Sequence, residues 1–291
     1  DIGLIMARRL TLEGATVLCV AEARPFPGGL ERNVSQCLYD FGIPLYLSTT
    51  VTQIFGPKRV EGVELCQVDA QGQPIPETAR RVDCDTLLLS VGLIPENEVG
   101  SKAGMAVDPA TNGAVTDALL QTNLPGVFAC GNSRKVMDLA DFVTRQGDTA
   151  GGNAARFVLG LPLEKMPPEQ ANAMAKGLPK PGIITCIRCP KGCRVMLGAD
   201  GKTEGNACPK GEEYALQEAK APKRVLTTTL KNAAGKLVPV KTSAGVPKER
   251  LLRCMDVVRG LPPIPVGLHC GEVAASDPFG LGADLVVTGD S

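Results

Sequence analysis

Apolar residues in the first half of the chain follow two kinds of spacing, and together these predict an α/β arrangement. Residues 2–13 and 30–41 carry apolar side chains at helical intervals. The apolar runs at 15–21 and 86–91 are continuous, which is typical of strands buried on both faces. Helices therefore alternate with buried strands in this half of the chain.

Between the apolar runs, shorter alternating segments indicate a β-meander. Its predicted strands lie at 45–55, 60–68 and near 80–82, with a turn at 71–74. A further short strand is predicted at 127–130, after the second apolar run. A long helix is predicted over about 139–157. This order is typical of a Rossmann-like dinucleotide-binding domain. Because its first helix begins at Ile2 with no strand before it, we expect this domain to be truncated at its N-terminus.

The pattern changes after residue 158. Residues 159–182 contain five prolines and no clear periodicity, so we interpret them as a linker. Residues 183–291 are expected to form a small cysteine-rich α+β domain, with helices near 210–218 and 248–259. The predicted organisation is an oxidoreductase portion at 1–158, the linker, and this second domain.

Composition removes several classes of function. Lys and Arg together number 31, as do Asp and Glu, so charge does not favour binding to nucleic acid or to a membrane surface. The sequence has no apolar run long enough to span a bilayer and no secretory signal at its start. Four of its eleven cysteines cluster between residues 186 and 208, which indicates metal or redox chemistry in a reducing, cytoplasmic compartment.

Two residues near the N-terminus are candidates for dinucleotide contacts. Gly3 stands where a glycine-rich loop would enter a helix, although a glycine at that place is common. Glu22 ends the next apolar run, where a carboxylate can accept hydrogen bonds from a ribose 2′-hydroxyl. A solvated glutamate at a strand end explains Glu22 equally well. If Glu22 does bind the ribose, NAD is favoured over NADP.

Two later segments resemble motifs of the pyridine-nucleotide–disulfide oxidoreductase-like flavoproteins. Residues 90–97 (SVGLIPEN) look like the G-x-x-P-x-N stretch that leaves their NAD domain, and residues 122–132 (TNLPGVFACGN) look like their second FAD signature. Residues 1–158 thus resemble the C-terminal part of such proteins. The resemblance implies FAD and NAD as cofactors, with contacts at Gly92, Pro95, Gly131 and Asn132.

The resemblance is incomplete at one position. The family has Asp where this chain has Asn132, which keeps an acceptor oxygen but loses the charge. Asp138 and Asp141 are secondary candidates, more simply explained as acids at a helix start. No paired cysteines at the spacing of a redox dithiol occur in residues 1–158, which disfavours the disulfide-reductase branch.

The cysteine cluster has the spacing C-x2-C-x3-C-x14-C and consists of Cys186, Cys189, Cys193 and Cys208. Four thiolates suit either a [4Fe–4S] cluster or a structural zinc ion. We favour iron–sulfur, because paired C-x2-C motifs are the usual zinc-ribbon spacing. The only histidine, His269, gives little support to a hydrolase.

The cysteine-rich half also carries resemblances. Its C-x2-C-x3-C triplet and the GNACPKG segment at 205–211 resemble the cluster motif of the molybdenum and tungsten bis-pterin oxidoreductases, with Lys210 at a matching position. No pterin-binding body follows, so that cofactor is not implied. The segments PKRVLT at 222–227, VKT at 240–242 and PK at 247–248 carry a closer resemblance. Through them, residues 183–288 resemble a domain of unknown function that is found beside flavoproteins of the anaerobic glycerol-3-phosphate dehydrogenase type.

These observations predict a flavoprotein oxidoreductase in which NAD(H), FAD and a four-cysteine cluster exchange electrons. The partners expected are NAD(H) and either a dehydrogenase subunit or an electron-carrier protein. The alternative, from a different class, is a non-catalytic, zinc-stabilised subunit that docks on a separate dehydrogenase.

Overall fold

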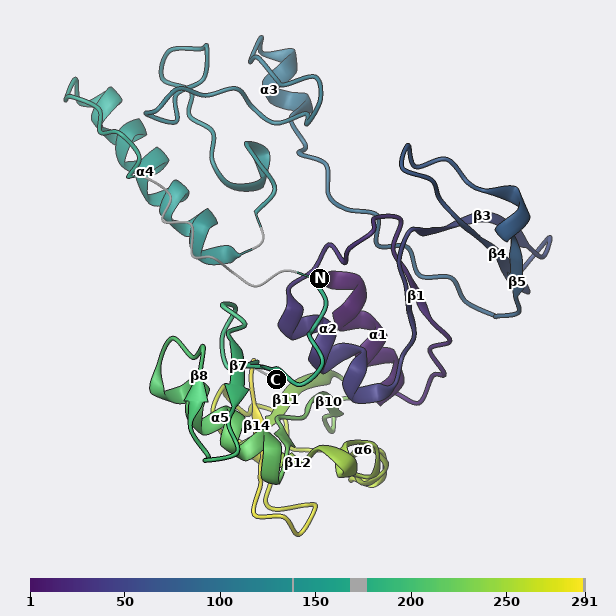
Figure 1. Cartoon of the computed structure of the whole chain (residues 1–291). Coiled ribbons are helices and arrows are strands. Elements are labelled where there is room, and N and C mark those ends of the chain that lie inside the picture. Colours follow the sequence, from purple (N-terminus) through teal and green to yellow (C-terminus); the bar gives the residue numbers. More distant parts are fainter. Residues whose placement is uncertain (138, 168–176, 290–291) are drawn as a thin grey trace. The chain divides into compact units, whose positions relative to one another are not determined.

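The computed structural model describes residues 1–137, 139–167 and 177–289 (Figure 1). Contacts divide the chain into two compact units, of which one joins Asp1–Leu89 to Ala173–Ser291 and the other is Ser90–Asn172. The predicted domains at 1–158 and 183–291 were drawn on sequence pattern and stay a prediction. Part of the predicted linker, residues 168–176, lies outside the described residues.

The first unit begins with two helices packed against each other. Helix α1 (Ile2–Leu12) and helix α2 (Glu31–Cys37) bury a shared cluster that includes Leu4, Val34 and Leu38. A short 3-10 helix, η1 (Tyr39–Phe41), continues α2 and ends at Gly42. The helices predicted at 2–13 and 30–41 are therefore confirmed.

A small parallel pair of strands is formed by one segment between these helices and one after them along the chain. Strands β1 (Val20–Ala21) and β2 (Leu45–Tyr46) pair in parallel over two residues each. The predicted buried strand at 15–21 is thus mostly irregular, and Leu18 is 45% exposed.

The predicted β-meander is confirmed as an antiparallel sheet. It consists of β3 (Thr49–Phe55), β4 (Gly62–Gln67) and β5 (Arg80–Val82), in the order β3–β4–β5. A 3-10 turn, η2 (Pro76–Thr78), precedes β5. The alternating pattern predicts these strands correctly because antiparallel neighbours follow each other along the chain and need only short turns.

The largest core of the first unit lies in the C-terminal half of the chain. Its four-stranded sheet has the order β10 (Thr227–Lys231), β11 (Leu237–Thr242), β14 (Leu285–Val287) and β13 (Val273–Ala275). Helix α6 (Leu251–Gly260), preceded by the 3-10 turn η4 (Lys248–Arg250), packs Met255 and Val258 into this core. Leu12 of α1 joins the same core and is fully buried.

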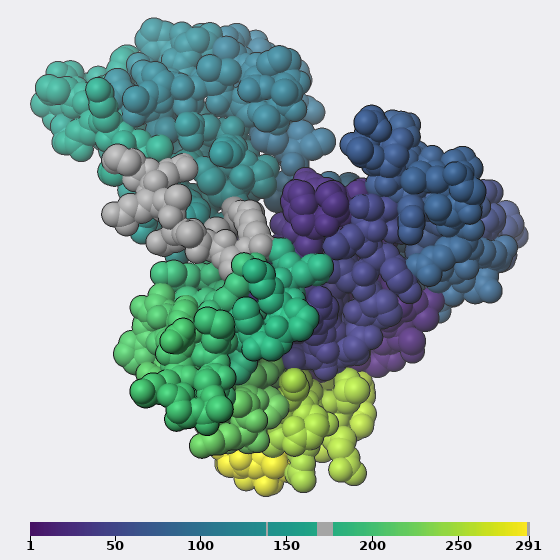
Figure 2. Space-filling view, viewed as in Figure 1, coloured from purple at the N-terminus to yellow at the C-terminus, as the bar shows by residue number. Residues whose placement is uncertain are grey.

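The cysteine-rich lobe is a second, smaller sheet with one helix. Strands β6 (Ile184–Thr185), β7 (Arg194–Leu197) and β8 (Thr203–Glu204) pair antiparallel, and α5 (Pro209–Lys220) packs on β7 and β8. The pair β9 (Lys223–Arg224) and β12 (Val246–Pro247) follows. In the space-filling view the green cysteine-rich lobe lies against the purple N-terminal helices (Figure 2), in agreement with contacts between α2 and β6.

The second unit contains little regular structure besides one long helix. Its helices are α3 (Glu98–Lys102), the 3-10 turn η3 (Gly131–Ser133) and α4 (Ala140–Val158). Helix α4 confirms the prediction at 139–157. The predicted strand at 127–130 is reduced to an isolated bridge between Phe128 and Gln121.

The prediction of a buried strand at 86–91 is wrong. These residues form no regular structure, and Leu89 and Val91 are 66% and 92% exposed. A strand that is apolar on both sides must be hydrogen-bonded between neighbours, and within the described residues none pairs with it. The sequence run alone could not reveal this lack of a partner.

Candidate functional site

The turn at Gly131 is built by close packing against α4. Gly131 has φ +60°, and a Cβ there would lie 3.0 Å from Val143 Cγ1. Its N–H donates to Gln146 Oε1 at 2.9 Å, and Gln146 is 1% exposed. Only glycine takes this left-handed conformation without cost, so the glycine of the motif has a clear backbone reason.

Asn132 is exposed, but its acceptor oxygen is already engaged. Asn132 Oδ1 accepts a hydrogen bond from the backbone N–H of Met137 at 3.1 Å. The amide oxygen has a second lone pair, so a flavin hydroxyl would have to bind beside the N–H of Met137. The turn therefore fits the expected cofactor at the Gly131 backbone and less well at the Asn132 side chain. Asp141 lies in the first turn of α4, as expected of a helix-start acid, and Asp138 lies outside the described residues.

Asn97 links the two motifs of the second unit. Its amide donates to the carbonyl oxygens of Asn112 (2.7 Å) and Ser133 (2.8 Å), and its Oδ1 accepts from Ser133 Oγ at 2.6 Å. Asn112 in turn donates to the carbonyl of Pro95 at 2.6 Å. The structure thus brings Pro95 and the turn at Gly131 into one hydrogen-bonded assembly. Gly92 lies outside it, exposed and at φ +115°.

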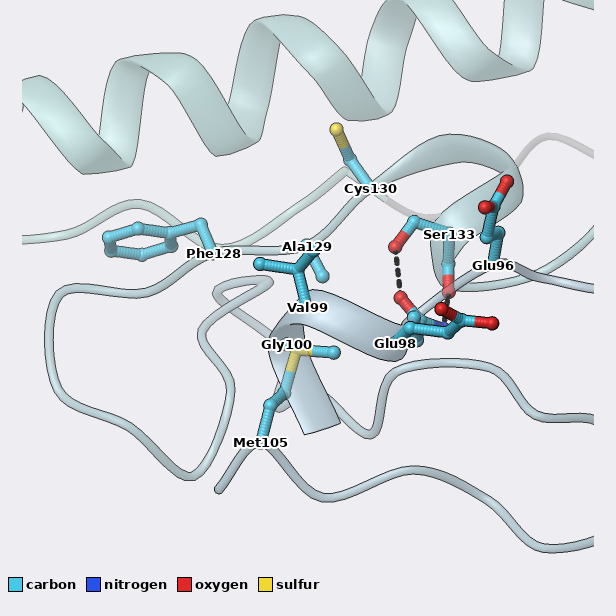
Figure 3. A pocket seen from close by; sticks show the side chains of 10 residues that line it. Glu96, Glu98, Val99, Gly100, Met105, Phe128, Ala129, Cys130 and Ser133 are labelled. Carbon is cyan, nitrogen blue, oxygen red and sulfur yellow. Dashed lines mark hydrogen bonds between the residues drawn. The ribbon is translucent and has the colours of Figure 1, made fainter. Parts of the chain in front are cut away.

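A pocket of about 520 Å³ lies beside this assembly. Figure 3 shows Phe128 at one end and Glu96 with Glu98 at the other, with the hydrogen bond between Ser133 and Asn97 as a dashed line. Cys130 also lines it. Two carboxylates at one end disfavour a phosphate group there, so the pocket suits an uncharged group better than a pyrophosphate.

Near the N-terminus, Glu22 is held by its own loop. Its carboxylate accepts backbone N–H bonds from Arg24 (3.0 Å) and Gly28 (3.1 Å). Each carboxylate oxygen has a second lone pair, so a ribose hydroxyl could still be bound. Gly3 lies in the first turn of α1, and the neighbouring Asp1 accepts from Leu30 N at 2.7 Å.

The four cysteines of the C-terminal cluster lie in one small lobe. Cys186 directly follows β6, Cys193 directly precedes β7, Cys189 lies in the turn between them, and Cys208 precedes α5. The N–H of Cys186 donates to the carbonyl of Cys193 at 2.8 Å. Cys186 is buried against Val195 and Tyr214, whereas Cys189 and Cys208 are exposed.

The loop that carries Cys208 lies against the start of β7, the strand that directly follows Cys193. Gly205, at φ +89°, lies so close to the carbonyl of Arg194 that any Cβ would collide with it. Asn206 then donates to the carbonyl of Cys208 at 3.1 Å. A larger residue at position 205 would push the fourth cysteine away from the other three.

The thiols are close enough to influence one another. Burial raises the pKa of the Cys186 thiol, and the charges of Cys193, Cys189 and Cys208 raise it further. Even so, within the described residues no three or more His, Cys, Asp or Glu side chains are arranged to hold a metal ion. Thiols without a cation have no attraction that draws them together, and thiolates repel. The lobe therefore contains all four cysteines that the sequence proposes as ligands, but in the described residues they do not form a metal site.

Sequence reasoning missed the polar residues that support the turn at Gly131 and the four-cysteine lobe. Asn97 stood in a quoted motif, but nothing local marked its side chain as a link between loops. Gln146 in α4, and Glu31 of α2 with its partner Arg194, gave no signal, because their partners lie 15 to 163 residues away.

Comparison with known families decides the class of the first half. The family described as "Pyridine nucleotide-disulphide oxidoreductase" matches residues 1–147 of the 291. The chain belongs to this family. The expected resemblance is confirmed, and the oxidoreductase portion forms the N-terminal half of this chain. The mixed α/β fold class is confirmed as well.

Curated relatives match only part of their length. A thioredoxin reductase of Listeria monocytogenes is 35% identical over 115 residues, which are 38% of this chain and 33% of that protein. The ferredoxin–NAD(+) reductase component of a biphenyl dioxygenase system from Paraburkholderia xenovorans is 28% identical over 163 residues, 55% of this chain and 37% of that protein. The chain thus spans about a third of the length of these relatives.

Among solved structures, the thioredoxin reductase of Lactococcus lactis is similar with a TM-score of 0.48 and 23% identity, over 55% of this chain and 51% of that one. Residues 209–289 match a family described as "Protein of unknown function (DUF1667)". This second match begins directly after Cys208, so it does not include the four cysteines. No helix in the described part of the chain is long and apolar enough to cross a membrane.

Proposed function

We propose that this chain is part of an FAD- and NAD(H)-dependent oxidoreductase whose electrons also pass through a [4Fe–4S] cluster. Cys186, Cys189, Cys193 and Cys208 would hold that cluster. The observation that carries the proposal is the placement of four cysteines at the ends of β6, β7 and α5, in one lobe of the compact unit that also contains the N-terminal oxidoreductase helices. Bound flavin would supply the exchange between two-electron hydride transfer and the single electrons that a cluster accepts.

On the nicotinamide side, the chain supplies Glu22 and the start of α1 at Gly3. The two backbone N–H groups that bind the Glu22 carboxylate fix its direction and leave acceptor capacity for a ribose 2′-hydroxyl. A 2′-phosphate at the same place would be repelled, so we propose NAD rather than NADP. On the flavin side, Gly131 provides a backbone without a side chain, and Asn132, Gly92 and Pro95 are the further proposed contacts.

On the cluster side, the lobe has a buried wall and an exposed edge. Cys186 and the half-buried Cys193 pack on apolar residues, which keeps water from that side, and Cys189 and Cys208 open to solvent. Loading would draw the two exposed thiols toward the two covered ones. An exposed edge suits exchange of electrons with a partner protein, because transfer needs close approach.

Among the relatives, the one named as a ferredoxin–NAD(+) reductase component agrees best with an electron-carrier partner. Thioredoxin reductase activity is less well supported, since the five cysteines of residues 1–158 stand singly. A dehydrogenase subunit is the other proposed partner. A cytoplasmic location belongs to the same proposal, because it rests on the reduced state that the thiols require.

The test is the iron, acid-labile sulfide and zinc content of anaerobically purified protein, with its visible spectrum. We expect about four irons and four sulfides per chain. Cys193→Ser should lose both, whereas Cys270→Ser, an exposed cysteine outside the four, should retain them. The same preparation with FAD and NADH added should bleach in the visible region under anaerobic conditions.

About one zinc per chain without a visible band would overturn the electron-transfer route. The zinc-stabilised docking subunit would then be the better description of the C-terminal half. Only the oxidoreductase family membership of residues 1–147 would remain for the first half.

A further inference from the structure

One acid of the oxidoreductase helices is buried against the cysteine hairpin. Glu31, the first residue of α2, is 0% exposed. One carboxylate oxygen accepts from Thr185 Oγ1 at 2.7 Å, and the other accepts from Arg194 Nε at 2.8 Å and Nη2 at 2.6 Å. A carboxylate with three charge-assisted hydrogen bonds is held firmly in place.

The two partners of Glu31 occupy one rung of the hairpin, next to two of the thiols. Thr185 and Arg194 face each other across β6 and β7. Cys186 follows the first and Cys193 precedes the second, and these two are joined by a backbone hydrogen bond. Glu31 thus fixes the rung directly next to both covered thiols.

Arg194, the third residue of this contact, also lies against the loop that carries Cys208. The carbonyl of Arg194 is the atom that Gly205 approaches so closely, and Gly205 begins the segment that ends at Cys208. Holding Arg194 therefore limits the position of the Cys208 loop as well as that of Cys193. The contacts of this one carboxylate thus lead to the segments that carry three of the four thiols.

We propose that Glu31 is a positioning residue of the four-cysteine site, supplied by the oxidoreductase segment. It holds the hairpin closed and keeps Cys186 covered whether or not a metal is bound. Its effect on metal affinity rests on the proposed function, and its effect on the thiols does not. Supporting residues of this kind set the geometry of first ligands in metal sites generally.

The chain offers a matched control at the other end of the same helical segment. Asp40 of η1 is also a buried acid and binds Arg224 at 2.6 and 3.1 Å. Arg224 lies beside the last turns of α5, about ten residues or 15 Å along the helix from Cys208. Loss of this pair should cost stability without changing the hairpin.

The first experiment needs no metal. Reduced, metal-free protein is alkylated, and mass spectrometry follows each cysteine with time. In Glu31→Gln, which keeps the size but not the charge, we expect Cys186 to react about tenfold faster or more. Asp40→Asn should leave the Cys186 rate within about twofold of the original protein. If Glu31→Gln does not fold, Thr185→Val takes its place as a smaller perturbation of the same rung. We expect Cys186 to react faster in that variant too.

The second experiment titrates the same proteins with Co²⁺ alone and follows the thiolate-to-metal absorption. Glu31→Gln should bind about 10–100-fold more weakly, and Asp40→Asn should bind as the original protein does. Equal Cys186 rates and equal Co²⁺ affinity in Glu31→Gln and the original protein would overturn the inference. So would equal losses in Glu31→Gln and Asp40→Asn, which would mark both acids as merely stabilising. Absence of any Co²⁺ or iron binding would overturn the proposed cluster instead, and the alkylation rates would still decide the role of Glu31.

Discussion

At Arg224, two carboxylates share one guanidinium in a place that water hardly reaches. The Arg224 side chain is 4% exposed and forms hydrogen bonds of 2.6–3.1 Å with Asp40 and Glu218, with Lys248 nearby at 3.3 Å from Asp40. Breaking such a buried pair on one side costs about 3–5 kcal/mol, because the remaining charge has no water to replace its partner. This cluster joins η1 to α5 and β9.

The pH dependence of this cluster follows from Glu218. Burial would raise the pKa of Glu218, but the hydrogen bonds and charge of Arg224 lower it below its ordinary value of 4.5. A lowered carboxylate pKa gives stability that is present above the ordinary value and is lost as pH falls through the folded one. We expect the free energy of unfolding of this unit to fall below about pH 5. In Glu218→Gln that acid limb should be shallower. Equal acid limbs in urea titrations of both proteins would contradict this.

Burial lowers the reactivity of the Cys37 thiol. Its pKa is raised by burial to about 11. At pH 8 only about one molecule in a thousand would carry the thiolate, which is the reactive form. Iodoacetamide at that pH should modify the exposed Cys270 within minutes and leave Cys37 untouched until the helices separate. Mass spectrometry of the labelled peptides measures this, and comparable rates for the two thiols would show the prediction to be wrong.

At this scale the sequence is informative only where the chemistry is local. The C-x2-C-x3-C spacing marks three thiols within eight residues, and the fourth follows in the same lobe, so their nearness along the chain could be read from the sequence. Their role as metal ligands stays a proposal. Glu31 and Arg194 are 163 positions apart, and no pattern connects them. Asn132 shows a further limit, since its motif position does not reveal that Met137 already uses its oxygen.

At the scale of elements, α1 has two faces and a different partner on each. Leu4 and Ala7 pack on α2, and Leu12 is buried among residues of the C-terminal sheet and α6. Arg9 also donates from this helix to the carbonyl of Thr227 at 3.1 Å. The helix is therefore shared between the oxidoreductase segment and the C-terminal segment.

Leu12→Ala tests this sharing. The substitution removes a side chain of 0% exposure and leaves a cavity, so it should cost about 2–5 kcal/mol of unfolding free energy. Ile5→Ala on the same helix, where the side chain is 47% exposed, should cost far less. Equilibrium denaturation followed by circular dichroism compares the two. Similar losses would place Leu12 outside the core.

Helices and antiparallel strands could be predicted because each needs only near neighbours. The helices at 2–13 and 139–157 and the meander around β4 are of this kind. The run at 86–91 is not, since a parallel strand depends on partners far along the chain, and its leucines are exposed here.

At the scale of the whole molecule, the two compact units meet in sequence at residues 89 and 90. The stretch from Leu88 to Ile94 is irregular and exposes Val91 and Ile94 at 92% and 80%. Thermolysin, which cleaves before apolar residues, should cut first within this stretch, because an exposed irregular backbone fits a protease cleft. Mass spectrometry of early fragments identifies the cut. A first cleavage inside α4 or β11 would contradict the division into units.

The two buried acids of α2 and η1 also limit how such a chain can be recombined with other sequences. Glu31 and Asp40 are buried carboxylates whose guanidinium partners come from residues 194 and 224. A gene rearrangement that replaced everything after the predicted linker at 159–182 would leave both acids buried without a positively charged partner. The incoming sequence would have to bring two arginines to the same places, so these segments are expected to be inherited together.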